Sequence, residues 1–380
     1  MATSSLSIKK HFVLLRDPRR RHRRLHRLLD IIVIAICAVV ADCDSWTDIA
    51  AFGRRRQGWL KRFLALPHGI PSHDTFERVF GLIDPQAFQA CFRQWMLALA
   101  EALGVKQIAI DGKTLCGSGA PSAHLGPLHL VSAWATKNHI SLGQVAVDAK
   151  SNEITAIPAL LELLDLHGAL VTIDAMGCQK EIAAKIREGG NHYVLTVKDN
   201  QPNLLADIQA CMEQALDTDF AGLDYDTYET EEQGHGRQER RSYTIIRDPE
   251  GIRDRDAWRD LHVIGMCYSR RTRQGKTSEE VRYFIGSKRA GARYYGKALR
   301  GHWGIENSLH WQLDVSFHED ADRTQERNAA QNMGLLRRLA VTLLKREPSK
   351  GSIACKRKQA GWDTNLLEAV LRTSANLESQ

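Results

Sequence analysis

Short apolar runs alternate with helical segments between residues 106 and 202, and this alternation constrains the fold more than any other feature of the sequence. Apolar and β-branched residues predict five strands, at residues 108–115, 129–136, 140–147, 169–173 and 193–197. Helical spacing predicts helices over residues 155–167 and 178–187. The order β-β-β-α-β-α-β indicates an α/β domain built on a mixed sheet with helices.

Two of these strands deliver an aspartate near their ends. In the first strand the apolar residues end at Asp111 and Gly112, and the fourth strand leads directly into Asp174. An aromatic-rich helical segment further along carries Glu306. Mg²⁺ takes few carboxylates from a protein and leaves its other positions to water and substrate phosphate. Two such ions about 4 Å apart activate an attacking oxygen and stabilise a leaving one. We therefore expect Asp111, Asp174 and Glu306 to hold two metal ions for phosphoryl transfer.

Other interpretations of these acids stay open. Most Asp-Gly pairs are simple turns, and further acids lie in comparable segments: Asp148, Asp199, Asp314, Glu319 and Asp320. A four-residue spacing places several polar side chains on one expected helix face: His302, Glu306, His310 and Asp314. The histidines of this face either ligate metal or present a polar, cation-bearing surface near phosphate.

The positive charge of the chain gathers in a few segments. The formal net charge is +7, and residues 1–30 hold nine Lys and Arg side chains against two Asp. A basic arm beside a folded body indicates contact with nucleic acid or, alternatively, a solvated tail. Further cations lie in a loop expected at residues 53–58, a strand at 235–243 and the ends of other elements. The expected DNA contacts are Arg19, Arg20, Arg21, Arg23, Arg24, Arg54, Arg55, Arg56, Lys113, Lys198, Arg237, Arg240, Arg241, Arg300 and His302.

The whole chain divides into five expected segments. Residues 1–104 predict an all-helical domain with the basic arm, which either binds DNA as a helix-turn-helix type or is a helical cap. Residues 105–202 form the first part of the α/β domain, and residues 203–286 a β-rich insertion. The insertion includes a cationic turn at 270–276, which either holds phosphates or is a solvated hairpin tip. A helical region at 287–345 carries Glu306, and residues 346–380 predict a peripheral basic tail.

Cysteine usage and hydropathy indicate the compartment. The eight cysteines form no C-x-x-C pair, and several lie in apolar runs, which is typical of reduced thiols. The apolar run at 31–41 has too few residues to span a bilayer and predicts a buried helix. We therefore expect a cytoplasmic protein.

Several motifs, taken together, resemble the H-repeat-associated insertion-sequence transposases. They are Pro71-Ser72-His73-Asp74-Thr75-Phe76-Glu77-Arg78, Asp111-Gly112-Lys113-Thr114, Asp174-Ala175-Met176-Gly177-Cys178-Gln179, Val197-Lys198-Asp199-Asn200-Gln201, His235-Gly236-Arg237 and His302-Trp303-Gly304-Ile305-Glu306-Asn307-Ser308-Leu309-His310-Trp311. The match follows the order of the chain over nearly its full length. That family belongs to the DDE transposases, whose catalytic domain is ribonuclease-H-like, and the strand order above is also that of this fold.

The resemblance implies a Mg²⁺- or Mn²⁺-dependent enzyme, with two ions per active site, that hydrolyses DNA at element ends. It would then use the freed 3′-hydroxyl to attack target DNA. The three acidic residues of the family fall on Asp111, Asp174 and Glu306. The implied partner is double-stranded DNA, both terminal inverted repeats and target, bound by a dimer in the synaptic complex. The implied location is the bacterial cytoplasm, on the nucleoid when DNA is bound.

One related signature, Tyr-Arg-Glu-Lys, is only partly present. Counting from Glu306, the tyrosine, arginine and lysine positions hold Leu299, His302 and Leu313, with Arg300 nearby. Two other functions stay open. One is a decayed or domesticated copy that binds terminal-repeat DNA without cutting it, although all three carboxylates are present. The other is a two-metal nuclease that cuts DNA without joining it.

Overall fold

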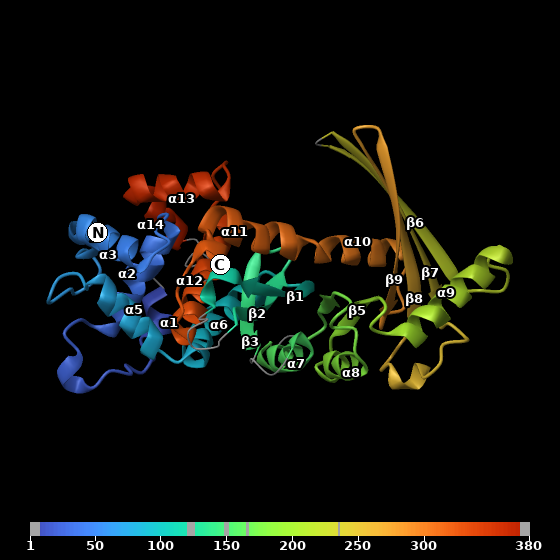
Figure 1. The fold of residues 1–380 in the computed structure, drawn as a ribbon, viewed down its shortest axis with the longest axis horizontal. Coiled ribbons are helices and arrows are strands. Elements are labelled where there is room, and N and C mark those ends of the chain that lie inside the picture. The colour runs from blue at the N-terminus through green and yellow to red at the C-terminus, as the bar shows by residue number, and fades with distance from the viewer. Residues whose placement is uncertain (1–7, 120–125, 148–151, 165–166, 235, 373–380) are drawn as a thin grey trace. The chain divides into compact units, whose positions relative to one another are not determined.

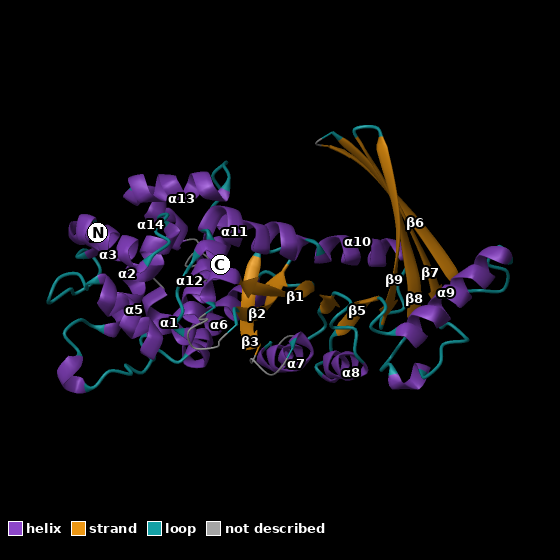
Figure 2. Cartoon of the chain, in the orientation of Figure 1, coloured by secondary structure: helices purple, strands orange, loops and turns teal. Residues whose placement is uncertain are grey.

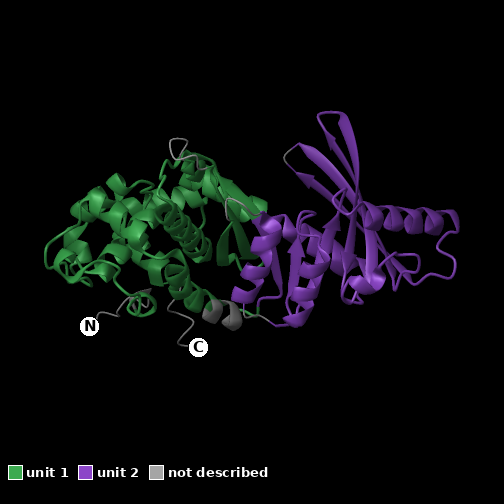
Figure 3. Ribbon diagram, turned by 60° about the horizontal axis from the view of Figure 1, so that its bottom comes forward, with its two compact units in different colours: residues 1–104, 112–150, 306–380 green, residues 105–111, 151–305 purple. Residues whose placement is uncertain are grey.

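The chain folds into two compact units, shown by the computed structural model in Figures 1 and 3. The structure describes residues 8–119, 126–147, 152–164, 167–234 and 236–372. Unit 1 comprises residues 1–104, 112–150 and 306–380, and unit 2 comprises residues 105–111 and 151–305. Each unit thus combines segments that are far apart in the sequence. This division differs from the five consecutive segments that the sequence predicts.

Unit 1 is mainly helical (Figure 2). Its N-terminal helices are α1 (Ile8–Phe12), η1 (Arg21–Arg23), α2 (Leu28–Val40), α3 (Trp46–Arg55), α4 (Gln57–Leu60), α5 (His73–Leu82) and α6 (Pro85–Ala102). Every residue of α2 from Ile31 to Val40 is at most 2% exposed, which confirms the predicted buried helix. Among the described residues, none of the helices is long and apolar enough to cross a membrane. The Ser72 side chain accepts a hydrogen bond from Thr75 N–H and so caps α5.

The C-terminal part of unit 1 packs onto these helices. It contains η5 (Glu306–His310), α11 (Trp311–Phe317), η6 (Glu319–Ala321), α12 (Arg327–Arg346), α13 (Ile353–Trp362) and α14 (Thr364–Arg372). Helix α12 is largely buried and contacts α2, α5 and α6. It also contacts β3 (Ile140–Val147), which forms an antiparallel hairpin with β2 (Leu128–Ala135). The short 3-10 helix η2 (Cys116–Ser118) precedes this hairpin.

Unit 2 contains most of the mixed sheet. The strand order is β3-β2-β1-β4-β5-β9-β8-β7-β6, and the two units share β1 (Gln107–Leu115). The central strands β1, β4 (Leu170–Ile173) and β5 (His192–Val197) run parallel. Strands β9, β8, β7 and β6 follow, each antiparallel to its neighbour. They span Lys276–Gly286, Val263–Arg273, Arg237–Arg247 and Tyr225–Gly234.

Helices cover this sheet within unit 2. They are α7 (Glu153–Leu163), α8 (Lys180–Glu188), α9 (Pro202–Asp217), η4 (Arg255–Ala257) and α10 (Ala292–His302). Helix α10 lies on β4, β5, β6 and β7. The core between them includes Val194, Ile245, Phe284 and Tyr295, each at most 1% exposed. This packing fixes the end of α10 against the strands that carry the aspartates.

The insertion differs from the sequence prediction at two places. The segment 270–276 is not a cationic turn, because β8 and β9 extend through it and only Gln274 and Gly275 form the connection, both at positive φ. Strand β6 was not predicted. Most of its side chains are exposed, so it lacks the apolar alternation by which a strand is recognised.

Two predictions for unit 1 are also wrong. Residues Gly53 to Arg55 belong to α3 and do not form a cationic loop. The C-terminal residues are not a peripheral tail, because α13 and α14 pack on α2 and α12. Arg357 of α13 is fully buried, with its guanidinium 3.8 Å from the ring centre of Phe317 and 2.6 Å from Asp44. Its charge is therefore paired within the fold and is not exposed at the surface.

Candidate active site

The parallel pairing of β1 and β4 places two aspartates side by side in unit 2. Ile110 is in register with Ile173, and Asp111 and Asp174 are the next residues along the chain. Both side chains are half-buried. Strand β1 continues through Gly112 to Leu115, in agreement with the strand predicted at 108–115. The recorded pairing with β4 ends at Ile110, so the two carboxylates lie where the strands separate.

Negative charge accumulates around Asp174. Burial raises its pKa above the usual range, and repulsion from Asp111 and Glu153 raises it further. A backbone hydrogen bond from Gly177 and attraction to His302 act to lower the same pKa. Carboxylates that repel one another in a half-buried place are stabilised by a cation between them. This cluster is therefore suited to hold a metal ion.

His302 supports the cluster from the end of α10. It is 8% exposed, and its Nδ1 lies 3.1 Å from the Thr172 hydroxyl on β4. That hydroxyl also donates to the Ile108 carbonyl on β1, at 3.3 Å. His302 thus links α10 to the two strands that carry the aspartates. Its burial separates it from the exposed cations expected to contact DNA.

Glu306 lies in unit 1, where it begins the π-helix η5 and is exposed. The prediction of one regular α-helical face from His302 to Asp314 is wrong, because η5 separates α10 from α11. A π-helix forms i→i+5 hydrogen bonds, so a four-residue spacing no longer keeps side chains on one line. Such turns occur frequently at functional sites.

Three of the alternative acids have structural partners within unit 1. The Lys113 ammonium lies 2.6 Å from Asp314 and 2.9 Å from Asp320. Burial acts to lower the pKa of Lys113, but the bonds to the two aspartates and attraction to Glu319 together raise it. Glu319 pairs with Arg338 at 3.0 Å, and both side chains are fully buried. All three acids are therefore engaged in ion pairs within unit 1, and Glu319 is closed to solvent.

The remaining acids give a mixed result. Asp199 is exposed after β5, and Asp148 lies outside the described residues. Glu153 was missed by sequence reasoning, although it acts on Asp174. Its only sequence signal is an acid directly after the helix cap Asn152, and acids at that position are common because the helix dipole favours them.

The donor set fits a hard divalent ion in part. Among the described residues, no cluster of three or more His, Cys, Asp and Glu side chains has the arrangement of a metal site. Asp111 and Asp174 nevertheless supply two neighbouring carboxylates, and Mg²⁺ commonly takes one or two from a protein. The excess negative charge around Asp174 is consistent with this chemistry.

The cations expected to contact DNA form two classes. Those with ion pairs or hydrogen bonds inside the protein are Arg19, Arg24, Arg56, Lys113, Arg237, Arg240, Arg241, Arg300 and His302. For the others the structure records no side-chain ion pair or hydrogen bond within the described ranges, and all are exposed: Arg20, Arg21, Arg23, Arg54, Arg55 and Lys198. The second class therefore presents its charge at the surface, and within it Lys198 is attracted to Glu280.

The basic strand β7 belongs to the first class. Arg240 lies 2.7 Å from Glu229 on β6, and Arg241 lies 2.6 Å from Glu239 and 3.4 Å from Glu232. Arg300 of α10 shares Glu232 at 2.7 Å. Much of the positive charge that the sequence shows here is thus neutralised within the sheet.

Comparisons with known proteins identify the family. A family model described as the Transposase DDE domain matches residues 75–343, and one described as DDE_Tnp_1-associated matches residues 9–96. The chain is 40% identical to the putative transposase YncI of Escherichia coli O157:H7, over 98% of this chain and 96% of that protein. It is 36% identical to the H repeat-associated putative transposase YhhI of Escherichia coli K12, over 97% of this chain and 98% of that protein.

A solved structure shows a distant likeness. It is the piggyBac transposase synaptic complex with hairpin DNA, at 8% identity and a TM-score of 0.41, covering 98% of this chain and 77% of that one. The sequence relatives and the domain model carry the assignment without it. They confirm the resemblance drawn from the motifs, and the chain belongs to the H repeat-associated transposases of the DDE family.

Proposed function

We propose that this chain cuts DNA at the ends of an insertion sequence and joins those ends to target DNA. The observation that carries the proposal is the β1–β4 register, which sets Asp111 beside Asp174. The raised pKa of Asp174 supports it, because burial and then repulsion from Asp111 and Glu153 disfavour its charged form, which a bound metal ion would stabilise. Glu306 is proposed as the third carboxylate, on the family motif and on its exposed position at the start of a π-helix.

Each group has a distinct role in this proposal. Asp111 and Asp174 would hold Mg²⁺ or Mn²⁺, with Asp111 shared between two ions, and Glu306 would complete the set. The ions, when bound, supply the activation of the attacking oxygen and the stabilisation of the leaving oxygen. His302 holds the end of α10 against β4 through Thr172 and so positions the aspartates. The parallel strands β1, β4 and β5 with α7 and α8 support a ribonuclease-H-like assignment of this part.

DNA binding is proposed for the exposed cations without partners. Arg20, Arg21 and Arg23 precede α2, and Arg54 and Arg55 end α3. Phosphate contacts of this kind make affinity fall steeply with salt. We propose that the N-terminal helices bind terminal-repeat duplex and that a dimer joins two ends, while Lys198 contacts DNA near the aspartates.

The test is cleavage and joining of a labelled duplex that carries the terminal repeat of the element. Reactions with Mg²⁺, Mn²⁺ and EDTA compare the wild type with Asp111→Asn, Glu306→Gln and the control Asp199→Asn, an exposed acid outside the proposed set. We expect metal-dependent nicking at the repeat boundary and transfer to target DNA, both lost in the first two variants and kept in the control.

Each other outcome has a distinct meaning. Binding of the repeat without nicking under every metal would support a catalytically silent DNA-binding protein. Nicking without joined products would support a nuclease that lacks strand transfer. Loss of cleavage in Asp199→Asn together with normal cleavage in Glu306→Gln would contradict the proposed carboxylate set.

A further inference from the structure

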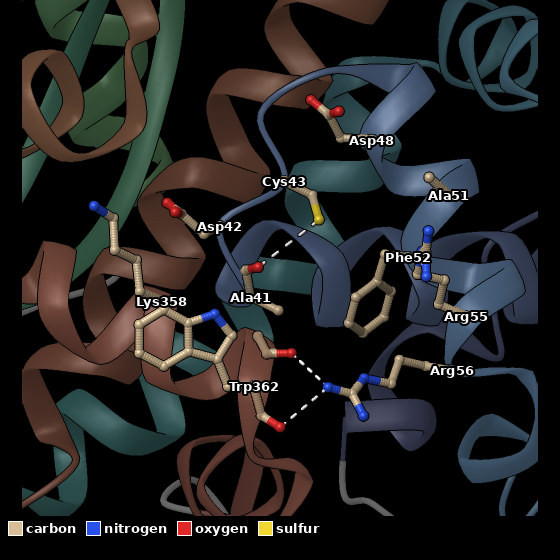
Figure 4. A pocket seen from close by; sticks show the side chains of 11 residues that line it. Ala41, Asp42, Cys43, Asp48, Ala51, Phe52, Arg55, Arg56, Lys358 and Trp362 are labelled. Carbon is tan, nitrogen blue, oxygen red and sulfur yellow. Dashed lines mark hydrogen bonds between the residues drawn. The ribbon is translucent and has the colours of Figure 1, made fainter.

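A groove between α3 and α13 in unit 1 lies outside the candidate active site. Its volume is about 620 Å³, within the size range of small-molecule sites. Residues from the end of α2 and from α3 form one side, and the last turns of α13 form the other. Its lining includes Asp42, Phe52, Arg55, Lys358 and Trp362. Figure 4 shows Lys358 and Trp362 across from Phe52 and Arg55.

The two sides of the groove are held together by specific contacts. The Arg56 guanidinium donates to the carbonyls of Gly361 at 2.6 Å and Trp362 at 3.1 Å (Figure 4). A Cβ at Gly361 would lie 3.0 Å from the Ala41 carbonyl, so the backbones approach closely here. The Trp59 indole also donates to Glu368 of α14, at 2.8 Å. The groove is therefore part of the packed fold and does not depend on a loose tail.

Two cations of the groove lining, Arg55 and Lys358, keep their charged groups exposed. Arg55 and Lys358 are exposed, and no ion pair or hydrogen bond is recorded for either side chain among the residues that the structure describes. Of the acids in the lining, Asp42 lies 3.2 Å from the buried Arg357 and is also attracted, more weakly, to Lys358. Asp48 accepts a hydrogen bond from the Ser45 hydroxyl at the start of α3. The positive charges of Arg55 and Lys358 therefore remain exposed to solvent.

Trp362 gives the groove an aromatic wall. It is 75% exposed, although a tryptophan is normally well covered by other side chains. It stands four residues after Lys358 on α13, so the two side chains share a helix face. Its backbone is fixed by Arg56 while its ring remains open to solvent. An anchored, exposed indole beside cations has the composition of a stacking platform for nucleic-acid bases.

We propose that this groove binds unpaired nucleotides of the DNA substrate, with Trp362 stacked on a base and Arg55 and Lys358 on the flanking phosphates. Stacking needs an exposed base face, which blunt duplex does not offer along its length, and so the groove selects single-stranded overhangs. Cations plus an aromatic platform are the combination by which proteins hold single strands. The inference rests on the proposed DNA-cutting function, since cut or frayed ends supply such nucleotides.

The experiment compares three labelled DNAs that carry the terminal repeat: a blunt duplex, the same duplex with a short overhang, and the single strand. Affinities are measured by fluorescence anisotropy at several salt concentrations. For Trp362→Ala we expect about tenfold weaker overhang binding at an unchanged salt slope, because base stacking is sequence-tolerant and uncharged. For Arg55→Gln with Lys358→Gln, the slope against log salt should fall by about 1.4 on the single strand.

The control is Arg293→Gln with Lys297→Gln, two exposed α10 cations for which no ion pair is recorded in the described ranges. It removes the same charge and should leave the overhang preference intact. Thermal melting establishes that each variant is folded. The proposal for the groove would be overturned if Trp362→Ala bound overhang DNA normally, or if it lost the same affinity for blunt and overhang DNA. In either case, cleavage by the wild type would leave the proposed function intact. A wild type that binds neither blunt nor overhang DNA would overturn both.

Discussion

Two clusters of acids on or near β1 differ in the charges that surround them. In unit 2, Asp111 and Asp174 lie side by side, and burial together with repulsion from Asp111 raises the pKa of Asp174. In unit 1, Asp314 and Asp320 lie next to the Lys113 ammonium, which neutralises them. Acids that have a cation are part of the architecture, whereas acids that face one another are costly and are retained for a ligand. We therefore propose the carboxylates of unit 2 as metal ligands, whereas those of unit 1 are structural.

The largest effect is expected from a change in the proposed metal cluster of Asp111 and Asp174. Asp174→Asn should lower the rate of repeat nicking by about 1,000-fold, because a metal-stabilised transition state loses several kcal/mol. Binding of the repeat should persist. Asp314→Asn is the matched control and should keep its nicking rate. The measurement is single-turnover cleavage of labelled repeat DNA, and equal losses in both variants would remove the distinction.

The next effect concerns the buried pair of Arg338 and Glu319. Arg338→Met leaves a buried carboxylate without a partner, so we expect the free energy of unfolding to fall by about 3–5 kcal/mol. Denaturant unfolding of the whole chain measures this change. Arg240→Met is the control, because its partner Glu229 is exposed and the loss should be slight. A stable Arg338→Met protein would show that this pair does not hold the fold.

A smaller effect is expected when Asp314 and Asp320 of unit 1 lose the cation between them. Lys113→Met leaves Asp314 and Asp320 facing each other, so we expect a loss of about 2 kcal/mol, between that of an exposed and a buried pair. The double variant with Asp320→Asn should recover part of this loss, since it removes the new repulsion. Thermal melting of the wild type, the single variant and the double variant measures these stability changes. If the effects of the two substitutions simply added, repulsion between Asp314 and Asp320 would not explain the loss.

The smallest effect has the opposite sign. Asp111→Asn removes one of the repelling charges, so without metal the variant should be more stable than the wild type, by on the order of 1 kcal/mol. Addition of Mg²⁺ should raise the melting temperature of the wild type more than that of the variant. Melting curves with and without Mg²⁺ test both statements. A variant less stable than the wild type in EDTA would show that repulsion from Asp174 is not the dominant effect of the Asp111 charge.

Sequence reasoning found the strands that deliver Asp111 and Asp174 because an apolar run ending in a single acid is a local pattern. The family motifs located Glu306, but the four-residue spacing around it suggested a regular helix. Whether that spacing stays α-helical or widens into a π-helix depends on packing, which no local pattern reports. Glu153 was missed because an acid after a helix cap usually serves the helix itself.

Cations were the hardest residues to place. Arg19, Arg338 and Arg357 have the same composition signal as exposed basic residues, yet each is buried. The acidic partners of Arg357, Asp42 and Asp44, are more than 300 residues away in the sequence. A count of charges shows none of these pairings, so the basic tail was expected at the surface. The six cations without recorded partners could be separated from the rest only by the structure.

Direct measurement of metal binding tests the central claim most closely. Mn²⁺ is titrated into the wild type, Asp111→Asn, Asp174→Asn and the control Asp320→Asn, and bound ion is followed by electron paramagnetic resonance. The account predicts that the first two variants bind Mn²⁺ at least about tenfold more weakly than the wild type and that the control binds it normally. Normal Mn²⁺ binding by Asp111→Asn and Asp174→Asn would contradict the claim that these two carboxylates of unit 2 are the metal site.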